Sequence, residues 1–159
     1  MTIEWESPDP SHLAKAAQLT GLEFLQALLT GELPPPPIAE LMGFALIEAE
    51  HGRVVFEGMP SERVYNPIGL VHGGFAMTLI DSATGCAVQS TLPRGTLYGT
   101  IETKANLVRP ILHDTGLLRC VATVVHTGSR IGTAEARVVD NGGKLFAHGT
   151  STCLVLPPS

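Results

Sequence analysis

The 159-residue sequence has few charged residues and no cluster of basic ones. Asp, Glu, Lys and Arg make up 16% of the chain, whereas about a quarter is usual in globular proteins. The formal net charge is −5, and Lys and Arg gather nowhere along the chain. We therefore expect no nucleic-acid partner. The low charge also indicates that part of the surface is hidden between copies of the chain, so we expect a homo-oligomer.

Long hydrophobic runs are also missing. No apolar stretch approaches the roughly 18 to 20 residues that a membrane-spanning helix needs, so we expect no membrane partner. The first ten residues, MTIEWESPDP, contain three acidic residues, no basic start and no apolar core. They do not resemble a secretory signal, and we expect a cytoplasmic protein.

Cysteine is scarce and widely spaced. Cys86, Cys120 and Cys153 are odd in number and form no CxxC motif, which argues against a disulfide framework and a zinc site. They are expected to be small buried side chains. The six histidines are scattered without the spacing of metal ligands. The sequence therefore predicts no metal and no other cofactor.

The chain is long enough for one domain and too short for two of ordinary size. Residues 1–37 are expected to form an N-terminal helical arm, an appendage or a lid. In it a helix from Ser11 to Thr30 in two pieces precedes a stiff polyproline II connector from Pro34 to Pro37. Residues 38–159 are then the main domain.

The main domain reads as α+β. Two short apolar stretches around His51 and Gly52 predict a hairpin. Gly74 to Ser90 predicts one long helix, apolar on nearly all sides and therefore buried. The turn sequences HDTG, HTGS and NGG divide the remainder into four segments, which predicts an antiparallel meander. Small residues on one face of the last strand indicate a curved sheet wrapped closely around the helix: Ala147, Gly149, Ser151 and Cys153.

A possible site lies at the start of that helix. The sequence HGG places Gly73 and Gly74 where helix N–H groups lack internal partners and the helix dipole is positive. The Gly73 N–H could donate to an oxygen that gains negative charge in a transition state. Alternatively, the glycines only permit a tight turn.

Asp81 interrupts the apolar helix and belongs to a polar stripe with Thr78, Ser82, Gly85 and Gln89. Its carboxylate lies roughly 10 to 12 Å along the axis from Gly73, too far for one small group to touch both. If the two act together, they come from two chains whose helices run antiparallel. The alternative is that the stripe only faces solvent or a partner helix.

Other kinds of site have weaker support. Ser82 lacks a nucleophile motif, and Cys86 faces away from Asp81. His72 is either a general base or, as we favour, a residue that hydrogen-bonds the backbone of its loop. In GSRIG, Ser129 and Arg130 form a turn suited to a phosphate, although one surface Arg is usually only solvated.

The stretch NPIGLVHGGFAMTLID, followed downstream by YGTIETKANLVRPI, strongly resembles the hotdog-fold thioesterases of the PaaI type. The resemblance covers residues 38–156. It implies a long curved antiparallel sheet around one central helix. It also implies two subunits joined into one continuous sheet, with dimers commonly paired into tetramers.

The resemblance implies roles for individual residues. Asp81 would be the general base or nucleophile on an acyl-CoA thioester, and the Gly73 N–H of the other subunit would polarise its carbonyl. Asn66 and His72 match positions that orient the nucleophilic water or shape the loop, and Thr100 matches a Ser or Thr that positions the water.

CoA would be part of the substrate rather than a cofactor. The resemblance implies that Arg130 contacts its phosphates, and the other candidates for binding substrate or CoA are Gly74, Ser82 and Ser129. Two alternatives stay open. One is a non-catalytic acyl-CoA-binding protein, and the other is a hotdog enoyl-CoA hydratase or dehydratase in which His72 pairs with an acid.

Overall fold

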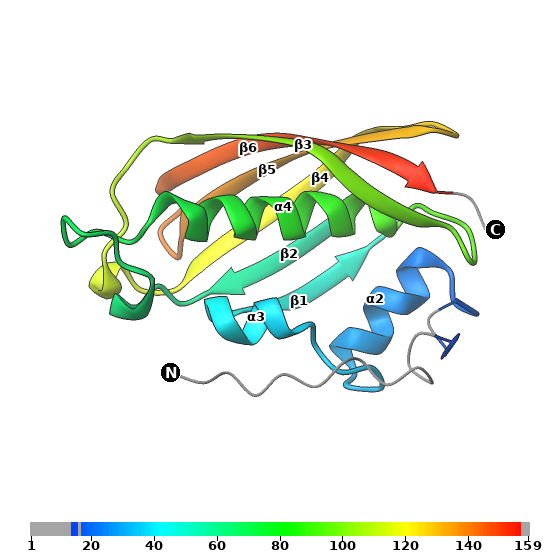
Figure 1. Cartoon of the computed structure of the whole chain (residues 1–159), viewed down its shortest axis with the longest axis horizontal. Coiled ribbons are helices and arrows are strands. Elements are labelled where there is room, and N and C mark those ends of the chain that lie inside the picture. Colours follow the sequence, from blue (N-terminus) through cyan, green and yellow to red (C-terminus); the bar gives the residue numbers. More distant parts are fainter. Residues whose placement is uncertain (1–13, 16, 157–159) are drawn as a thin grey trace.

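The centre of the fold is helix α4 (Gly73–Gln89), which lies along the concave face of a six-stranded antiparallel sheet (Figure 1). The computed structural model describes residues 14, 15 and 17–156. The strand order is β1-β2-β4-β5-β6-β3. This arrangement confirms the predicted α+β class and hotdog fold, and the predicted long helix is correct to within one residue at each end. The other elements are α2 (Gly21–Leu29), α3 (Pro37–Met42), β1 (Phe44–Glu50), β2 (Arg53–Gly58), η1 (Glu62–Val64), β3 (Leu97–Leu107), η2 (His113–Thr115), β4 (Leu118–Thr127), β5 (Ile131–Asp140) and β6 (Leu145–Leu156).

The predicted hairpin is confirmed, because β1 and β2 pair antiparallel on either side of His51 and Gly52. The predicted meander is correct for β4, β5 and β6 but wrong for β3. Strand β3 pairs with β6 at the edge of the sheet, while β4 lies next to β2. The HDTG segment is therefore a crossing connection and not a hairpin turn. This connection, residues 108–117, is longer than a hairpin loop and includes Pro110, which has no N–H to donate to a ladder, and the short helix η2.

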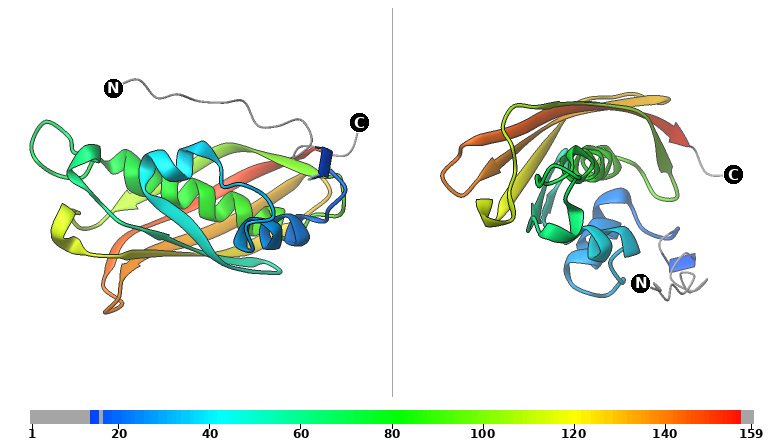
Figure 2. Two further views of the ribbon diagram at one scale, coloured as in Figure 1. Left: turned by 90° about the horizontal axis from the view of Figure 1, so that it is seen from below. Right: turned by 60° about the vertical axis from the view of Figure 1, so that its left-hand side comes forward.

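Small residues allow the sheet to curve closely around α4, as predicted (Figure 2). The inward positions of β6 are buried at Ala147, Gly149, Ser151 and Cys153. On β5, a methyl group at Gly132 would lie only 2.6 Å from the Val88 side chain of α4. Glycine is thus required where the strand backbone meets the helix.

The N-terminal helix α2 packs against the main body. Thr20 and Glu23 form a capping box at its start, and Leu25 is fully buried within the core around α4. The expected proline connector is shorter than predicted, because Pro37 is already the first residue of α3. Proline is favoured at that position, where its missing N–H costs nothing. Of the first predicted helical piece, residues 11–19, residues 11–13 and 16 lie outside the described residues; Ala14 and Lys15 are helical, and residues 17–19 form a turn.

Helix α4 is less completely buried than predicted. Met77 is 44% exposed, and Asp81 and Ser82 are half-buried on the same side. The other two residues of the polar stripe in the second half of α4 are covered. Tyr98 lies over Gly85, and Gly21 at the start of α2 lies against Gln89. One side of the first half of α4 is therefore left open. None of the helices within the described ranges is long and apolar enough to cross a membrane.

Candidate active site

The loop before α4 is organised by Asn66. Its side-chain oxygen accepts hydrogen bonds from the N–H groups of Ile68 (3.1 Å) and Leu70 (3.0 Å), and its own N–H donates to the Leu70 carbonyl at 2.7 Å. Gly69 supplies the left-handed conformation that this tight turn requires, at φ +80°. The contacts that Asn66 makes in one chain are thus those of a loop-shaping residue.

His72 caps α4, as we favoured from the sequence. Its ring Nδ1 accepts a hydrogen bond from the Gly74 N–H at 2.9 Å, while its backbone N–H donates to Val64. Because Nδ1 is the acceptor, the ring proton is on Nε2. His72 therefore uses one nitrogen to hold the start of the helix.

The cap leaves one helix donor free. Within the described residues the Gly73 N–H has no hydrogen-bond partner, and it lies at the positive end of the helix dipole. Leu107, the last residue of β3, lies against Gly73, so that a methyl group there would come within 2.6 Å of Leu107 Cδ1. Gly73 therefore has an N–H without a partner among the described residues, and a side chain at this position would collide with Leu107.

Asp81 contacts a residue that the sequence analysis did not single out. Its Oδ1 accepts a hydrogen bond of 3.0 Å from the Thr103 hydroxyl on β3. Thr103 Oγ1 in turn lies 3.0 Å from Ser151 Oγ on β6, which lies 2.7 Å from Thr84 Oγ1 on α4. Asp81 is thus joined to three elements through hydroxyl groups.

Among the described residues, no hydrogen bond joins Thr100 to Asp81. Its hydroxyl lies 4.0 Å from Cys153 Sγ, and its role in positioning water stays a prediction. A β-bulge between Thr100 and Glu102 explains why Thr103 faces Asp81. The bulge changes which residues face inward, so that Thr103 pairs with the inward-facing Ser151. Regular alternation would have placed residue 102 there, and the sequence carries no clear signal for the bulge.

Cys86 lies beside the Tyr98 hydroxyl, one turn and a residue beyond Asp81. Burial raises the pKa of the Cys86 thiol to about 12, and the nearby Asp81 charge adds to this effect. A thiol of this kind is protonated near neutral pH and is a poor nucleophile. The structure thus agrees with our rejection of Cys86 as the nucleophile.

The residues proposed to bind CoA lie apart from one another. Ser129 and Arg130 are exposed in the turn between β4 and β5. The Arg130 carbonyl accepts a hydrogen bond from the Val155 N–H of β6. Gly74 is in the first turn of α4, and Ser82 follows Asp81 on its open side. One chain does not bring these four residues together.

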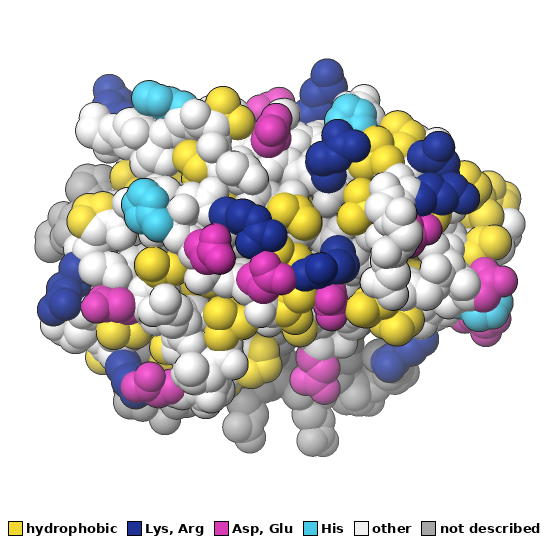
Figure 3. All heavy atoms as spheres, turned by 180° about the vertical axis from the view of Figure 1, so that it is seen from behind, with side chains coloured by type: hydrophobic (Ala, Val, Ile, Leu, Met, Phe, Trp, Pro, Cys, Tyr) yellow, Lys and Arg dark blue, Asp and Glu magenta, His cyan; other side chains and the backbone are white. Residues whose placement is uncertain are grey.

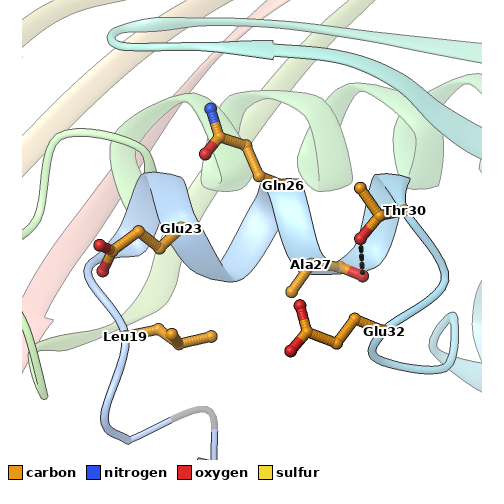
Figure 4. Close-up of a pocket in the computed structure, with 6 residues that line it drawn as sticks. All are labelled: Leu19, Glu23, Gln26, Ala27, Thr30 and Glu32. Atoms are coloured by element: carbon orange, nitrogen blue, oxygen red, sulfur yellow. Dashed lines mark hydrogen bonds between the residues drawn. The ribbon is translucent and has the colours of Figure 1, made fainter.

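Two hollows on the surface do not include Asp81 or Gly73. One, of about 280 Å³, lies on the outer side of α2 (Figure 4) and is lined by Leu19, Glu23, Gln26, Ala27, Thr30 and Glu32. The other, of about 680 Å³, is lined by residues of the β1–β2 turn and the end of β4, with Thr91. The open side of α4 next to Asp81 therefore becomes an enclosed site only if another surface covers it.

The geometry limits what one chain can do. Asp81 and Gly73 lie eight residues apart on the continuous helix α4, which separates them by about 12 Å along its axis. His72 is equally remote from Asp81. No group of three or more His, Cys, Asp or Glu side chains placed to hold a metal ion occurs among residues 14, 15 and 17–156.

Comparison with known proteins agrees with this fold. The family model described as "Thioesterase superfamily" matches residues 68–147. A candidate esterase from Halobacterium salinarum is 34% identical over 133 residues, covering 80% of this chain and 86% of that protein. A 1,4-dihydroxy-2-naphthoyl-CoA hydrolase from Listeria monocytogenes is 27% identical and covers 74% of this chain and 94% of its own.

Solved structures are similar as well. A candidate thioesterase related to phenylacetic acid degradation, from Ralstonia eutropha JMP134, superposes with a TM-score of 0.74 at 27% identity, covering 82% of this chain and 98% of that one. A conserved protein from Pseudomonas aeruginosa gives a TM-score of 0.71 at 32% identity over 77% of this chain and 95% of that one. The chain belongs to the thioesterase superfamily, and it is a hotdog-fold thioester hydrolase.

Proposed function

We propose that this enzyme hydrolyses an acyl-CoA thioester with an aromatic or medium-chain acyl group to the free acid and CoA. Asp81 of one chain acts as general base or nucleophile, and the Gly73 N–H of the partner chain donates to the carbonyl oxygen. Asn66, His72 and Thr100 shape the site and position water, and no metal or redox cofactor takes part. We place the enzyme in the cytoplasm as a homodimer, with dimers pairing into tetramers.

One observation carries this proposal. Gly73 presents an N–H that has no partner among the described residues, and Asp81 presents a half-buried carboxylate on the open side of the same helix, about 12 Å away. Two antiparallel copies of α4 would bring the Asp81 of each chain toward the Gly73 of the other. The open side then becomes a pair of equivalent sites, as two-fold symmetry requires.

The edge of the sheet supports the same arrangement. Strand β3 pairs only with β6 among the described strands, and its Ile101 side chain is 60% exposed. Exposed edge strands with apolar side chains readily pair with another chain. Figure 3 shows acidic and basic side chains next to one another on the face seen from behind. Among the described residues, Glu48 on β1 forms ion pairs with both Arg53 on β2 and Arg119 on β4.

The chemistry follows from these groups. The Asp81 carboxylate removes a proton from water as the water oxygen bonds to the thioester carbon. The Gly73 N–H stabilises the oxyanion, an effect worth about 10²- to 10³-fold in rate. Collapse of the intermediate breaks the C–S bond, and the CoA thiolate leaves and takes up a proton. Gly74 and Ser82 border this reaction, and Ser129 and Arg130 bind the phosphates of CoA.

The two named relatives guide the choice of acyl group. The Listeria enzyme hydrolyses an aromatic acyl-CoA by name, and the Ralstonia protein is related to phenylacetic acid degradation. We therefore test 1,4-dihydroxy-2-naphthoyl-CoA, phenylacetyl-CoA and medium-chain acyl-CoAs, following thiol release with a disulfide reagent. We expect turnover of at least one substrate. Asp81→Asn is expected to lower kcat by at least about 10²-fold, because the amide cannot accept the proton.

Two results would contradict this function. An Asp81→Asn variant as active as the parent would exclude the mechanism. No turnover on the whole panel, together with tight acyl-CoA binding, would favour a binding protein. Loss of enoyl absorbance with crotonyl-CoA would instead identify a hydratase.

A further inference from the structure

We propose that Thr103 is a positioning residue for Asp81 and that it acts as the end of a buried hydroxyl chain, Thr103–Ser151–Thr84. The inference rests on the proposed function, in which the Asp81 carboxylate must meet a water molecule at a fixed angle. It assigns a role to three residues that the resemblance to the family did not point to.

The first step is the contact with the carboxylate. The Thr103 hydroxyl donates to Asp81 Oδ1 at 3.0 Å. Hydrogen bonds to a charged acceptor are roughly twice as strong as neutral ones. The other oxygen, Oδ2, has no hydrogen-bond partner among the described residues. Thr103 therefore restrains one carboxylate oxygen and leaves the other available to water.

The second step is the direction of the chain. A threonine hydroxyl has a single proton, so Thr103, when it donates to Asp81, can only accept from Ser151 Oγ, 3.0 Å away. Ser151 then accepts from Thr84 Oγ1 at 2.7 Å. When Thr84 gives its single proton to Ser151, each hydroxyl donates toward the carboxylate, and bonds arranged in this way strengthen one another.

The third step is the rigidity of the far end. Ser151 is 1% exposed and Thr84 is fully buried. The Ile80 carbonyl at 2.8 Å and the Asp81 carbonyl at 3.2 Å also lie within reach of the Thr84 hydroxyl and share its single proton with Ser151. The chain thus begins in the same turn of α4 that carries Asp81 and returns to its side chain through β6 and β3.

The fourth step concerns the alternatives at these positions. The inward face of β6 is otherwise lined with alanine, glycine and cysteine, and an alanine at position 151 would fit without any hydrogen bond. Buried hydroxyls stabilise little over apolar groups of the same shape once both partners are replaced. The three hydroxyl groups therefore contribute little to the stability of the strands. Their hydrogen bonds are better explained as a way to fix the orientation of the Asp81 carboxylate.

The test compares Thr103→Val with Thr103→Ser on the best substrate of the panel. Valine keeps the shape and the β preference but removes the donor, and serine restores it. We expect Thr103→Val to lower kcat by about 10- to 100-fold with KM within about twofold, because a misplaced catalytic group costs rate rather than affinity. Thr103→Ser should recover most of kcat.

The same pair of strands offers a matched control. Thr152 on β6 donates to the Glu102 carboxylate at 3.0 Å across the outer face. Thr152→Val therefore removes a threonine–carboxylate hydrogen bond of the same kind, away from Asp81, and should leave kcat within about twofold of the parent. An equal loss of kcat in Thr152→Val and Thr103→Val would mean a merely structural role and would overturn the proposal.

A second measurement does not depend on turnover. If Thr103 bonds to Asp81, Thr103→Val should lower Tm less in an Asp81→Ala background than in the parent, because the bond is already absent there. Equal decreases would overturn the contact. A parent protein that turns over no substrate would overturn the proposed function instead, and the two Tm decreases alone would then decide whether Thr103 holds Asp81. If the parent is active, full kcat in Thr103→Val overturns the positioning role.

Discussion

At the scale of single residues, the two glycines at the start of α4 differ in the hydrogen bonding of their N–H groups. The His72 ring accepts a hydrogen bond from the Gly74 N–H, whereas the Gly73 N–H has no hydrogen-bond partner in the part of the chain that the structure describes. Because Gly73 has no side chain, a substrate oxygen can approach that N–H directly. The same glycines that allow the turn also make the proposed oxyanion donor accessible.

Cys120 gives a prediction about pH and stability. Burial raises the pKa of its thiol from 9.0 to about 12. Between these values the unfolded chain loses the proton and the folded chain keeps it, so the stabilisation is present below about pH 9 and is lost as pH rises. We expect the difference in free energy of unfolding between the parent and Cys120→Ala to shrink by about 2 kcal/mol from pH 8 to pH 10.5.

Urea unfolding at both pH values measures this difference. Other groups that titrate at high pH, among them the buried Tyr98 hydroxyl, affect both proteins equally. Cys120→Ala also removes buried volume, but that loss does not change with pH. A difference that stays constant over this range would show that the thiol ionises equally easily in both states.

At the scale of elements, helix α2 illustrates how a segment outside the resemblance joins the core. Leu25 is fully buried, whereas Leu29, one turn further on the same helix, is 37% exposed. The Gly21 N–H donates to the Leu92 carbonyl just beyond α4 at 3.0 Å. The helix is thus fixed at its start and through its buried side chain.

Leu25 and Leu29 form a matched pair for testing this packing. We expect Leu25→Ala to lower the free energy of unfolding by about 2 to 4 kcal/mol, because it leaves a cavity in the core. Leu29→Ala should cost less than about 1 kcal/mol. Urea unfolding at one chain concentration measures both. Similar small effects for both variants would mean that α2 does not share the cooperative core.

At the scale of the whole molecule, the proposed site needs two chains. Strand β3 runs beside α4 at the edge of the sheet (Figures 1 and 2). The hydrogen bond from Thr103 on β3 to Asp81 places the open side of α4 next to that edge. Covering them together would hide the exposed apolar side chains of Met77 and Ile101. The low charge of the chain is consistent with such a covered surface.

Mixed dimers test the sharing directly. Asp81→Asn removes the base, and Gly73→Pro removes the N–H at a helix position that tolerates proline. His72, with φ −60° and ψ 138°, already has the conformation required before proline. Each variant alone should lose at least about 10²-fold in kcat. A purified mixed dimer should recover about half of the parent activity, because one of its two sites has both groups intact.

Gly73→Ala is the control for the proline, since it adds a carbon next to Leu107 but keeps the N–H. It should retain more activity than Gly73→Pro. A mixed dimer as inactive as either variant would contradict the shared site. Sedimentation of the parent, compared with Ile101→Lys at the β3 edge, should show a dimer that the lysine weakens.

Much of this protein could be predicted from the sequence because its signals are local. The largely apolar run of residues 74–90 and the small inward residues of β6 predicted a helix and a closely packed strand, and both elements were confirmed, although the helix is less completely buried than predicted. The turn at Asn66 and the cap at His72 likewise depend on neighbours in the chain. Local hydrogen bonds and side-chain periodicity depend only on residues close together in the sequence, so they can be predicted from it.

The tertiary structure decided what depends on distant residues. The place of β3 at the edge depends on which strands can cover α4, and the bulge after Thr100 determines that Thr103 meets Asp81. A one-residue shift of register exchanges the faces of a strand, and no local pattern specifies it here. The sequence alone thus established the helix, its glycine turn and its acid, whereas strand pairing selected the hydroxyl that holds the acid.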